Sequence, residues 1–130
     1  MPHCLSPLLR DPGVPHGLWN LRTGEAIATR VIPAFDSASR RQGLLGRDGL
    51  AMGEALVLAP CSAVHTAFMR FVLDLLFLDR RGRVVKVAGG VRPWRIRAAW
   101  RGFAVVELAA GSAARSGTRA GDTVELRTIV

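Results

Sequence analysis

The most apolar part of the chain lies between residues 61 and 79, and its second half, Leu73–Leu78, reads Leu-Asp-Leu-Leu-Phe-Leu. Apolar residues occupy both alternating sets of positions there, which predicts a strand covered on both faces. We expect the first half to form a separate strand piece, with a break near residues 70–72. A second apolar run, residues 55–59, ends at Pro60 and predicts another buried strand.

Shorter runs with strand character follow one another along the rest of the chain, separated by turn residues. They cover residues 19–22, 27–32, 83–87, 103–108 and 123–127. The segment Asp79-Arg80-Arg81-Gly82 predicts the turn of a hairpin, because Gly82 can adopt the left-handed conformation that such turns need. We interpret residues 92–95 as a loop.

One short helix is predicted after residue 35. Asp36, Ser37 and Ser39 are possible N-caps, and Gly46 is a natural residue for the position just beyond the C-terminal end. Residues 111–115 allow only a single further helical turn.

Seven or eight short strands with one short helix indicate a mostly β fold, a single-domain antiparallel β-sandwich or barrel. We place this domain at residues 18–130. Residues 1–17 contain four of the seven prolines and show no periodicity, so we expect a flexible N-terminal tail there. With 130 residues, 49% of them hydrophobic, the chain is long enough to bury a core without disulfides or a metal.

Neither a membrane span nor a signal peptide is predicted. No apolar run approaches the roughly 18 to 20 residues that span a bilayer, and the N-terminus lacks a basic stretch followed by an apolar one. Cys4 and Cys61 fit a reducing compartment, with no structural disulfide between them. We therefore expect a cytoplasmic protein that is a monomer.

The net charge of +8 invites a nucleic-acid hypothesis, but the distribution of the charge argues against it. Of the eighteen cations Lys86 is the one lysine, and the seventeen arginines are spread along the chain, a bias that GC-rich coding produces regardless of function. The densest group is Arg92, Arg95, Arg97 and Arg101. We expect a solvated basic surface and do not expect nucleic acid to be the partner.

Two carboxylates, Asp74 and Glu107, lie in the two most apolar predicted strands. A carboxylate paired there with Arg47, Arg70 or Arg95 would shape an anionic-ligand pocket or act as an acid or base with a perturbed pKa. The structural alternative, which we favour, is an ion pair or a carboxylate that accepts backbone N–H groups. Arg47, Asp74 and Glu107 are thus expected to be structural buried polar residues.

Cys61 and His65 form a second catalytic candidate beside Asp74. A nucleophilic thiolate needs the imidazole within about 3 Å, whereas residues four apart on an extended strand are about 13 Å apart, so a turn would have to intervene. Zinc would need two more ligands from the N-terminal tail, and no finger-like spacing is present. We expect no metal and no cofactor, since the glycines between residues 43 and 53 also lack the order of a phosphate loop.

The loop around Trp94, rich in arginine, is the strongest candidate for recognition. Loops carry function on β scaffolds, and an indole can stack on a base, a sugar or a partner's side chain. The alternative is that the indole caps the sandwich and the arginines are solvated. The residues of this predicted ligand or protein binding site are His65, Met69, Arg70, Trp94 and Arg95.

Several short segments matter for their order and spacing. They are Arg41-Gln42-Gly43-Leu44-Leu45-Gly46-Arg47, Cys61, His65-Thr66-Ala67-Phe68-Met69-Arg70, Asp74-Leu75-Leu76-Phe77-Leu78-Asp79, Pro93-Trp94-Arg95, Glu107-Leu108-Ala109-Ala110-Gly111 and Gly121-Asp122. In this order, over residues 19–127, the chain resembles the family called domain of unknown function 192. It differs in having Phe68 where many relatives have Trp, and Leu45 where many have Met.

The resemblance implies a small single-domain β-rich fold from bacteria or archaea, with no established activity or cofactor. Some relatives are exported, and some are encoded beside pilus or secretion genes. We therefore expect a non-enzymatic ligand- or protein-binding accessory module, whose link to pilus or secretion machinery is implied by the resemblance alone. One alternative is a small hydrolase or transferase that uses Cys61 and His65, or Asp74 with a perturbed pKa. A second alternative is nucleic-acid binding through the arginine-rich surface.

Overall fold

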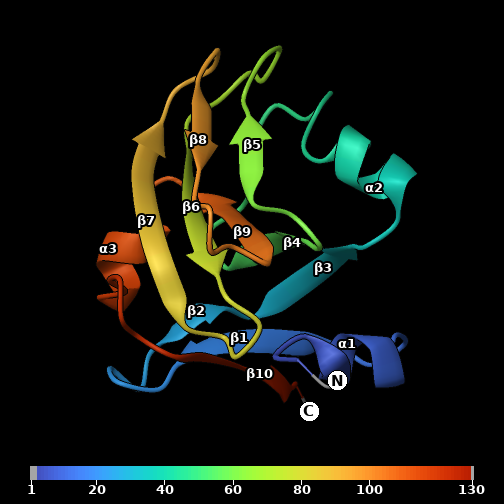
Figure 1. Cartoon of the computed structure of the whole chain (residues 1–130), viewed down its shortest axis with the longest axis vertical. Helices are drawn as coiled ribbons and strands as arrows, with labels where there is room; N and C mark the ends of the chain where they lie inside the picture. Colours follow the sequence, from blue (N-terminus) through green and yellow to red (C-terminus); the bar gives the residue numbers. More distant parts are fainter. Residues whose placement is uncertain (1–2, 130) are drawn as a thin grey trace.

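The computed structural model describes residues 3–129, which form ten strands and three short helices (Figure 1). A five-stranded sheet lies at the centre. Its strands, in spatial order, are β3 (Arg30–Ala34), β4 (Glu54–Leu58), β9 (Ala104–Ala109), β6 (Leu73–Leu78) and β7 (Val84–Val91). Strands β3 and β4 run parallel, and the other neighbouring pairs of this sheet are antiparallel.

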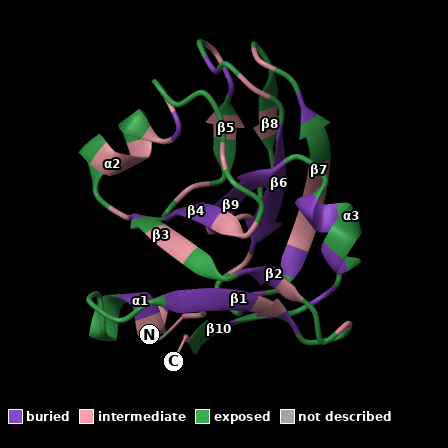
Figure 2. Cartoon of the chain, turned by 180° about the vertical axis from the view of Figure 1, so that it is seen from behind, coloured by how far each residue is buried: buried purple, intermediate pink, exposed green. Residues whose placement is uncertain are grey.

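Two hydrophobic cores lie on opposite faces of this sheet, because side chains alternate between the faces along each strand. In β6, Leu76 and Leu78 belong to the first core, whereas Leu73, Leu75 and Phe77 belong to the second. Every residue of β6 and of β9 is buried, and Figure 2 shows these strands among the most continuously buried parts of the molecule. The prediction of strands covered on both faces is confirmed.

A second sheet and two helices cover the first core. The sheet consists of β10 (Val124–Thr128), β1 (His16–Asn20) and β2 (Ala26–Ala28) in spatial order, and the helices are α1 (Ser6–Arg10) and α3 (Ser112–Ser116). Leu18 of β1, Leu126 of β10 and Ala113 of α3 are buried in this core. The first and last strands of the chain are hydrogen-bonded neighbours in antiparallel register.

Different elements cover the second core. They are the segment that follows α2 (Ser37–Gln42), and β5 (Ala63–His65), which pairs with β8 (Ile96–Ala98) in a two-stranded sheet. Leu44 and Met69, which flank these elements in the sequence, are buried against the sheet. The candidate site described below lies between α2 and β5.

Helix α2 begins and ends at residues with the right capping chemistry. The Asp36 carboxylate accepts hydrogen bonds from Ser39 N at 2.8 Å and from Ser39 Oγ at 2.7 Å, and so caps the N-terminus. The helix ends after Gln42, because Gly43 has a φ of +46° that residues with side chains rarely adopt. The predicted end near Gly46 is therefore too late.

The fold is mostly β, as predicted, but its strands and helices are shorter and more numerous than the sequence pattern indicates. Residues 27–32, predicted as one strand, are divided between β2 and β3, because Thr29 N and Arg30 N both donate to Gly53 O, at 2.8 and 3.1 Å. Strand β8, which directly follows the predicted loop 92–95 and was not predicted, has only three residues. The sheets formed by residues 3–129 are open, and none closes into a barrel.

The N-terminal segment differs from the expected flexible tail. Leu5 and Leu8 lie three residues apart at α1, which brings them to the same side of the helical turn. Both are buried in the first core, with 1% and 5% of their surfaces exposed. Strand β1 already begins at His16, inside the predicted tail. Residues 1 and 2 lie outside the described part of the chain. None of the helices in residues 3–129 is long and apolar enough to cross a membrane.

Candidate functional site

A cleft of about 510 Å³, which we call the α2 cleft, lies between α2 and β5 on the second face of the central sheet. Its apolar walls include Leu44, Leu45, Leu58 and Met69. Its polar lining includes Ser37, Arg40, Arg41, His65 and Glu107. Segments that are far apart in the sequence thus meet at one concave site.

Glu107 forms part of the inner lining of the α2 cleft. It lies in β9, opposite Leu56 of β4 and Leu75 of β6, and 4% of its surface is exposed. Burial raises the pKa of its carboxyl to about 7, and no residue in the described part of the chain donates a hydrogen bond to it or forms an ion pair with it. Buried polar side chains are usually paired within a protein. Here the polar atoms of Glu107 face the cleft, and none of the partners proposed from the sequence pairs with them.

The end of α2 lies next to this carboxyl. A Cβ atom placed on Gly43 would be 3.6 Å from Glu107 Oε1. Arg40 donates to the carbonyl oxygens of Phe35 and Ala59, which ties α2 to the end of β4. The geometry of the cleft therefore depends on the glycine that ends α2 and on the arginine that anchors the helix.

Cys61 and His65 both line the α2 cleft, but no hydrogen bond joins them among residues 3–129. The Cys61 thiol donates to Ala63 O at 3.2 Å. Burial is the largest cause of a raised pKa for this thiol, and the charge of Glu107 also raises it, whereas the backbone of Ala63 and the positive charge of Arg40 lower it. A nucleophilic cysteine needs a lowered pKa. This environment opposes thiolate formation.

Asp74 lies on the other face of the sheet, away from the α2 cleft. Its Oδ1 accepts from Gly90 N at 2.9 Å, and its Oδ2 accepts from Gly111 N and Ala113 N at 3.1 and 3.0 Å. With 2% of its surface exposed, Asp74 ties the end of β7 to the start of α3. A carboxylate whose two oxygens both accept backbone hydrogen bonds has a structural role, and neither oxygen is free for acid–base chemistry.

Thr66 joins the two loops that flank the β5–β8 sheet. Its hydroxyl donates to Arg92 O at 2.7 Å and accepts from Arg95 N at 2.8 Å. Phe68 and Trp94, one on each loop, stack edge to face with ring centroids 4.7 Å apart and with 71% and 61% of their surfaces exposed. Both have positive φ, an uncommon conformation for residues with side chains. We call this pair the aromatic tip.

The five residues of the predicted binding site do not line one cavity. His65 and Met69 line the α2 cleft. Trp94 belongs to the aromatic tip, Arg95 donates to the carbonyl oxygens of its own loop, and the exposed Arg70 forms an ion pair with Asp48 at 2.8 Å.

The expected buried role of Arg47 is also corrected by the structure. Arg47 is exposed, because it follows the tight turns after α2 rather than facing the sheet.

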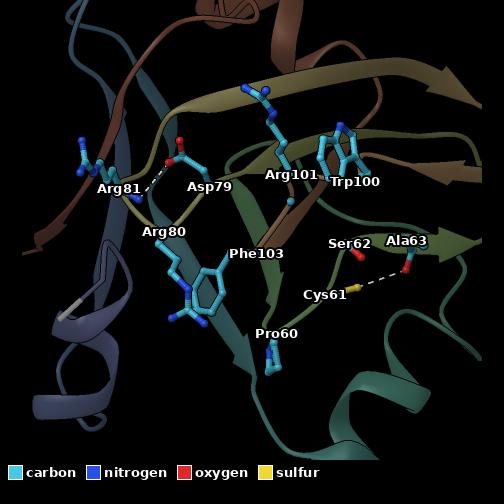
Figure 3. A pocket seen from close by; sticks show the side chains of 11 residues that line it. Pro60, Cys61, Ser62, Ala63, Asp79, Arg80, Arg81, Trp100, Arg101 and Phe103 are labelled. Atoms are coloured by element: carbon cyan, nitrogen blue, oxygen red, sulfur yellow. Dashed lines mark hydrogen bonds between the residues drawn. The ribbon is translucent and has the colours of Figure 1, made fainter. Parts of the chain in front are cut away.

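Sequence reasoning missed a second and larger concavity, of about 790 Å³, which we call the arginine pocket (Figure 3). Its lining includes Asp79, Arg80, Arg81, Trp100, Arg101 and Phe103. Arg80 lies over the Phe103 ring at 4.4 Å and Arg101 lies beside Trp100 at 5.7 Å. Of the ion pairs formed within residues 3–129, none involves Arg80, Arg81 or Arg101. The hairpin turn around Arg80 and the adjacent Trp100-Arg101 pair were the available signals, but only the fold brings them together.

The two concavities share one wall. Pro60, Cys61 and Ala63 line the α2 cleft on one side and the arginine pocket on the other. Within residues 3–129, no three His, Cys, Asp or Glu side chains gather as a metal site would require.

The structure is that of a small, mostly β domain with a cleft of about 510 Å³ on one face of a five-stranded sheet. A solved structure of a protein of unknown function from Novosphingobium aromaticivorans is similar, with 27% identity, a TM-score of 0.73, and 85% of this chain and 83% of that chain covered. A Sinorhizobium meliloti protein described as a "putative transcription regulator" is 24% identical, with a TM-score of 0.75 and coverage of 86% and 92%.

The chain belongs to the domain of unknown function 192 family, described as Uncharacterized ACR, which matches residues 20–126. The resemblance seen in the sequence is confirmed. A comparison with curated proteins gave no match.

Proposed function

We propose that the protein is a non-enzymatic binding module whose ligand or protein partner docks in the α2 cleft. The observation that carries this is the carboxyl of Glu107, which is buried, lacks a partner among the described residues, and lines a cavity of about 510 Å³. A concave, mostly apolar site with one or a few oriented polar groups is the usual form of a ligand pocket. Three segments of the family resemblance also meet there, through Gly43, Met69 and Glu107.

We further propose that this module works as a cytoplasmic monomer beside pilus or secretion machinery. Support for that setting comes from the family resemblance alone. Co-purification with a component of such machinery, lost when the α2 cleft is blocked, is the expected result. Co-purification that survives blocking of the cleft would contradict docking at this site.

Two methionines allow a direct test of binding by NMR of ¹³C-methyl-labelled protein. Met69 lines the α2 cleft, whereas Met52 lies elsewhere, with its sulfur 3.2 Å from Ser112 Oγ. Small four-carbon probes, 1-butanol, n-butylammonium and butyrate, are titrated separately. We expect at least one probe to shift the Met69 methyl resonance saturably while the Met52 resonance stays in place.

A pair of matched substitutions controls this experiment. Leu45→Trp fills the α2 cleft and should abolish the shift of Met69, whereas Leu21→Trp makes the same change at an exposed site outside the cleft and should preserve it. If no probe moves Met69 more than Met52, the cleft does not bind small ligands and the proposed function is wrong.

The enzyme hypothesis has less support than the binding module. Cys61 has a thiol whose pKa is raised, and the two oxygens of Asp74 are engaged by three backbone N–H groups. Slow alkylation of Cys61 by iodoacetamide at pH 6 is the expected result. Rapid alkylation at that pH would restore the nucleophile hypothesis.

A second candidate function, nucleic-acid binding, is supported by the arginine pocket. Guanidinium groups bind phosphate, and Trp100, with 89% of its surface exposed, offers a face for stacking. Base stacking is worth about 1 to 3 kcal/mol. If single-stranded oligonucleotide binds there, Trp100→Ala should weaken binding about fivefold or more, while Trp94→Ala at the aromatic tip should have little effect. Equal effects of the two substitutions would contradict binding in the arginine pocket.

A further inference from the structure

We infer, on the basis of the proposed function, that the ligand of the α2 cleft carries a cationic nitrogen on an apolar chain, and that this nitrogen pairs with Glu107. The shared chemistry is an ammonium or guanidinium group, which a free amine or the side chain of a lysine or arginine in a partner protein could supply.

The surroundings of Glu107 point to a positive partner. The residues beside it on neighbouring strands, Leu56 and Leu75, are apolar and cannot donate a hydrogen bond. An ionised carboxylate at this depth needs a compensating charge close to it, and no residue in the described part of the chain forms an ion pair with Glu107. A cation entering the cleft would take the place of the proton on the carboxyl, and that proton would pass to solvent.

The side chains that line the cleft indicate the chemistry of the rest of the ligand. Leu44, Leu58 and Met69 are buried and line the cleft together with the half-buried Leu45. A ligand that reaches the carboxyl therefore passes along aliphatic and thioether surface, which favours a short apolar chain behind the charged nitrogen.

Other titratable and charged groups face the same cleft. Arg40 and Arg41 lie on α2, His65 ends β5, and Cys61 lies on the shared wall. Arg40 donates to Phe35 O and Ala59 O, and Arg41 Nε donates to Ser37 O at 3.4 Å, so both guanidinium groups already have carbonyl partners. The two arginines nevertheless support the opposite hypothesis, in which an anion binds to them while Glu107 stays protonated.

The sign of the pH dependence separates the two hypotheses. Because the pKa of Glu107 is about 7, its ionised fraction rises about tenfold between pH 6 and pH 8. We expect the affinity for n-butylammonium to rise by up to about tenfold over this range, the affinity for 1-butanol to stay constant, and butyrate to bind least well at pH 8. The Met69 methyl resonance reports binding for all three probes.

Two variants assign the effect to Glu107. Glu107→Gln should remove the preference for n-butylammonium over 1-butanol and its pH dependence, while the binding of 1-butanol remains. Glu125→Gln, the same change at an exposed carboxylate outside the cleft, should keep both. In the wild type, n-butylammonium should also lower the pKa of Glu107 read from its ¹³C carboxyl resonance. Lys- and Arg-containing pentapeptides then test the protein source: binding of these peptides that exceeds that of the free amine favours a partner protein, and the reverse favours a small amine.

The possible failures are distinct. If 1-butanol shifts Met69 but n-butylammonium binds no better, or butyrate binds best and more tightly at pH 6, the inferred cation is wrong while the α2 cleft stays a binding site. If none of the probes shifts Met69, the proposed function fails and the inferred ligand fails with it.

Discussion

Replacing Glu107 with Gln should change the way in which the free energy of unfolding depends on pH. Burial raises the pKa of this carboxyl from an ordinary 4.5 to about 7 in the folded protein. Each tenfold change in proton affinity is worth about 1.36 kcal/mol. The ionised carboxylate therefore destabilises the folded state, relative to the unfolded chain, by about 3 kcal/mol.

The direction of the change follows from proton binding. The folded protein keeps the proton of Glu107 up to about pH 7, whereas the unfolded chain releases it near pH 4.5. Between these values the folded state binds more protons than the unfolded state, so the free energy of unfolding falls as the pH rises. The stability that the protonated carboxyl provides is complete below pH 4.5 and is lost above about pH 7. Gln carries no such proton, so the variant should lack this loss.

Urea unfolding followed by tryptophan fluorescence measures the effect from pH 5 to pH 8. The stability of the wild type, relative to Glu107→Gln, should fall by about 2.5 kcal/mol across this range. Glu125→Gln, at an exposed position paired with Arg127, is the matched control and should show no such change. A difference between wild type and Glu107→Gln that stays constant within about 0.5 kcal/mol would refute the reasoning.

Other predictions concern buried polar side chains that hold segments of the fold together through hydrogen bonds. Asp74→Ala leaves three backbone N–H groups without their acceptor, and it should lower the free energy of unfolding by about 3 to 5 kcal/mol. Asp48→Ala, which removes an exposed ion pair, is the control and should lower it by under about 1 kcal/mol. Thr66→Val should cost about 1 to 2 kcal/mol and speed hydrogen exchange at Trp94 N, which donates to Thr66 O. Because Arg22 and other donors hold the pKa of Asp122 well below its usual range, wild-type stability should fall as the pH drops below about 4, and Asp122→Asn should lack that fall.

For each of these predictions, a specific result would contradict the reasoning. A loss below about 1 kcal/mol for Asp74→Ala in urea unfolding would mean that water replaces the carboxylate as acceptor. Unchanged exchange at Trp94 N in Thr66→Val would mean that the aromatic tip is held by the stacking of its rings instead. If the stability of Asp122→Asn still falls as the pH drops, the acid sensitivity comes from other carboxylates.

The strands that the sequence predicted well are those with enough residues to show a pattern. In β6 and β9 both faces are apolar, and a short apolar run of this kind reports burial directly. The hairpin after β6 could also be predicted, because a glycine lies at the turn between two strand patterns. In the structure, this residue, Gly82, has a φ of +84°. Three-residue strands such as β8 carry no periodicity, so their existence depends on partners far away in the chain.

The candidate site was harder to predict, because its members come from four segments. Glu107 was visible as a charged residue in an apolar strand, but the sequence does not show whether a partner faces it. The left-handed Gly43 brings the end of α2 to that carboxyl, and only the folded loop reveals this proximity. Trp94 and Arg95 seemed to belong with His65, but the hydroxyl of Thr66 holds their loop at the tip of the β5–β8 sheet instead.

The pairing of β1 with β10 has a practical consequence for how the molecule can be attached to other things. His16 of β1 pairs with Thr128 of β10, and the end of β10 lies on the side of the molecule away from α2 and β5 (Figure 1). An affinity tag, a fluorophore or a sensor surface joined through Ile129 would therefore leave the α2 cleft unobstructed. A display format anchored there should capture cleft ligands, whereas His3 lies close to Pro60, which lines the cleft.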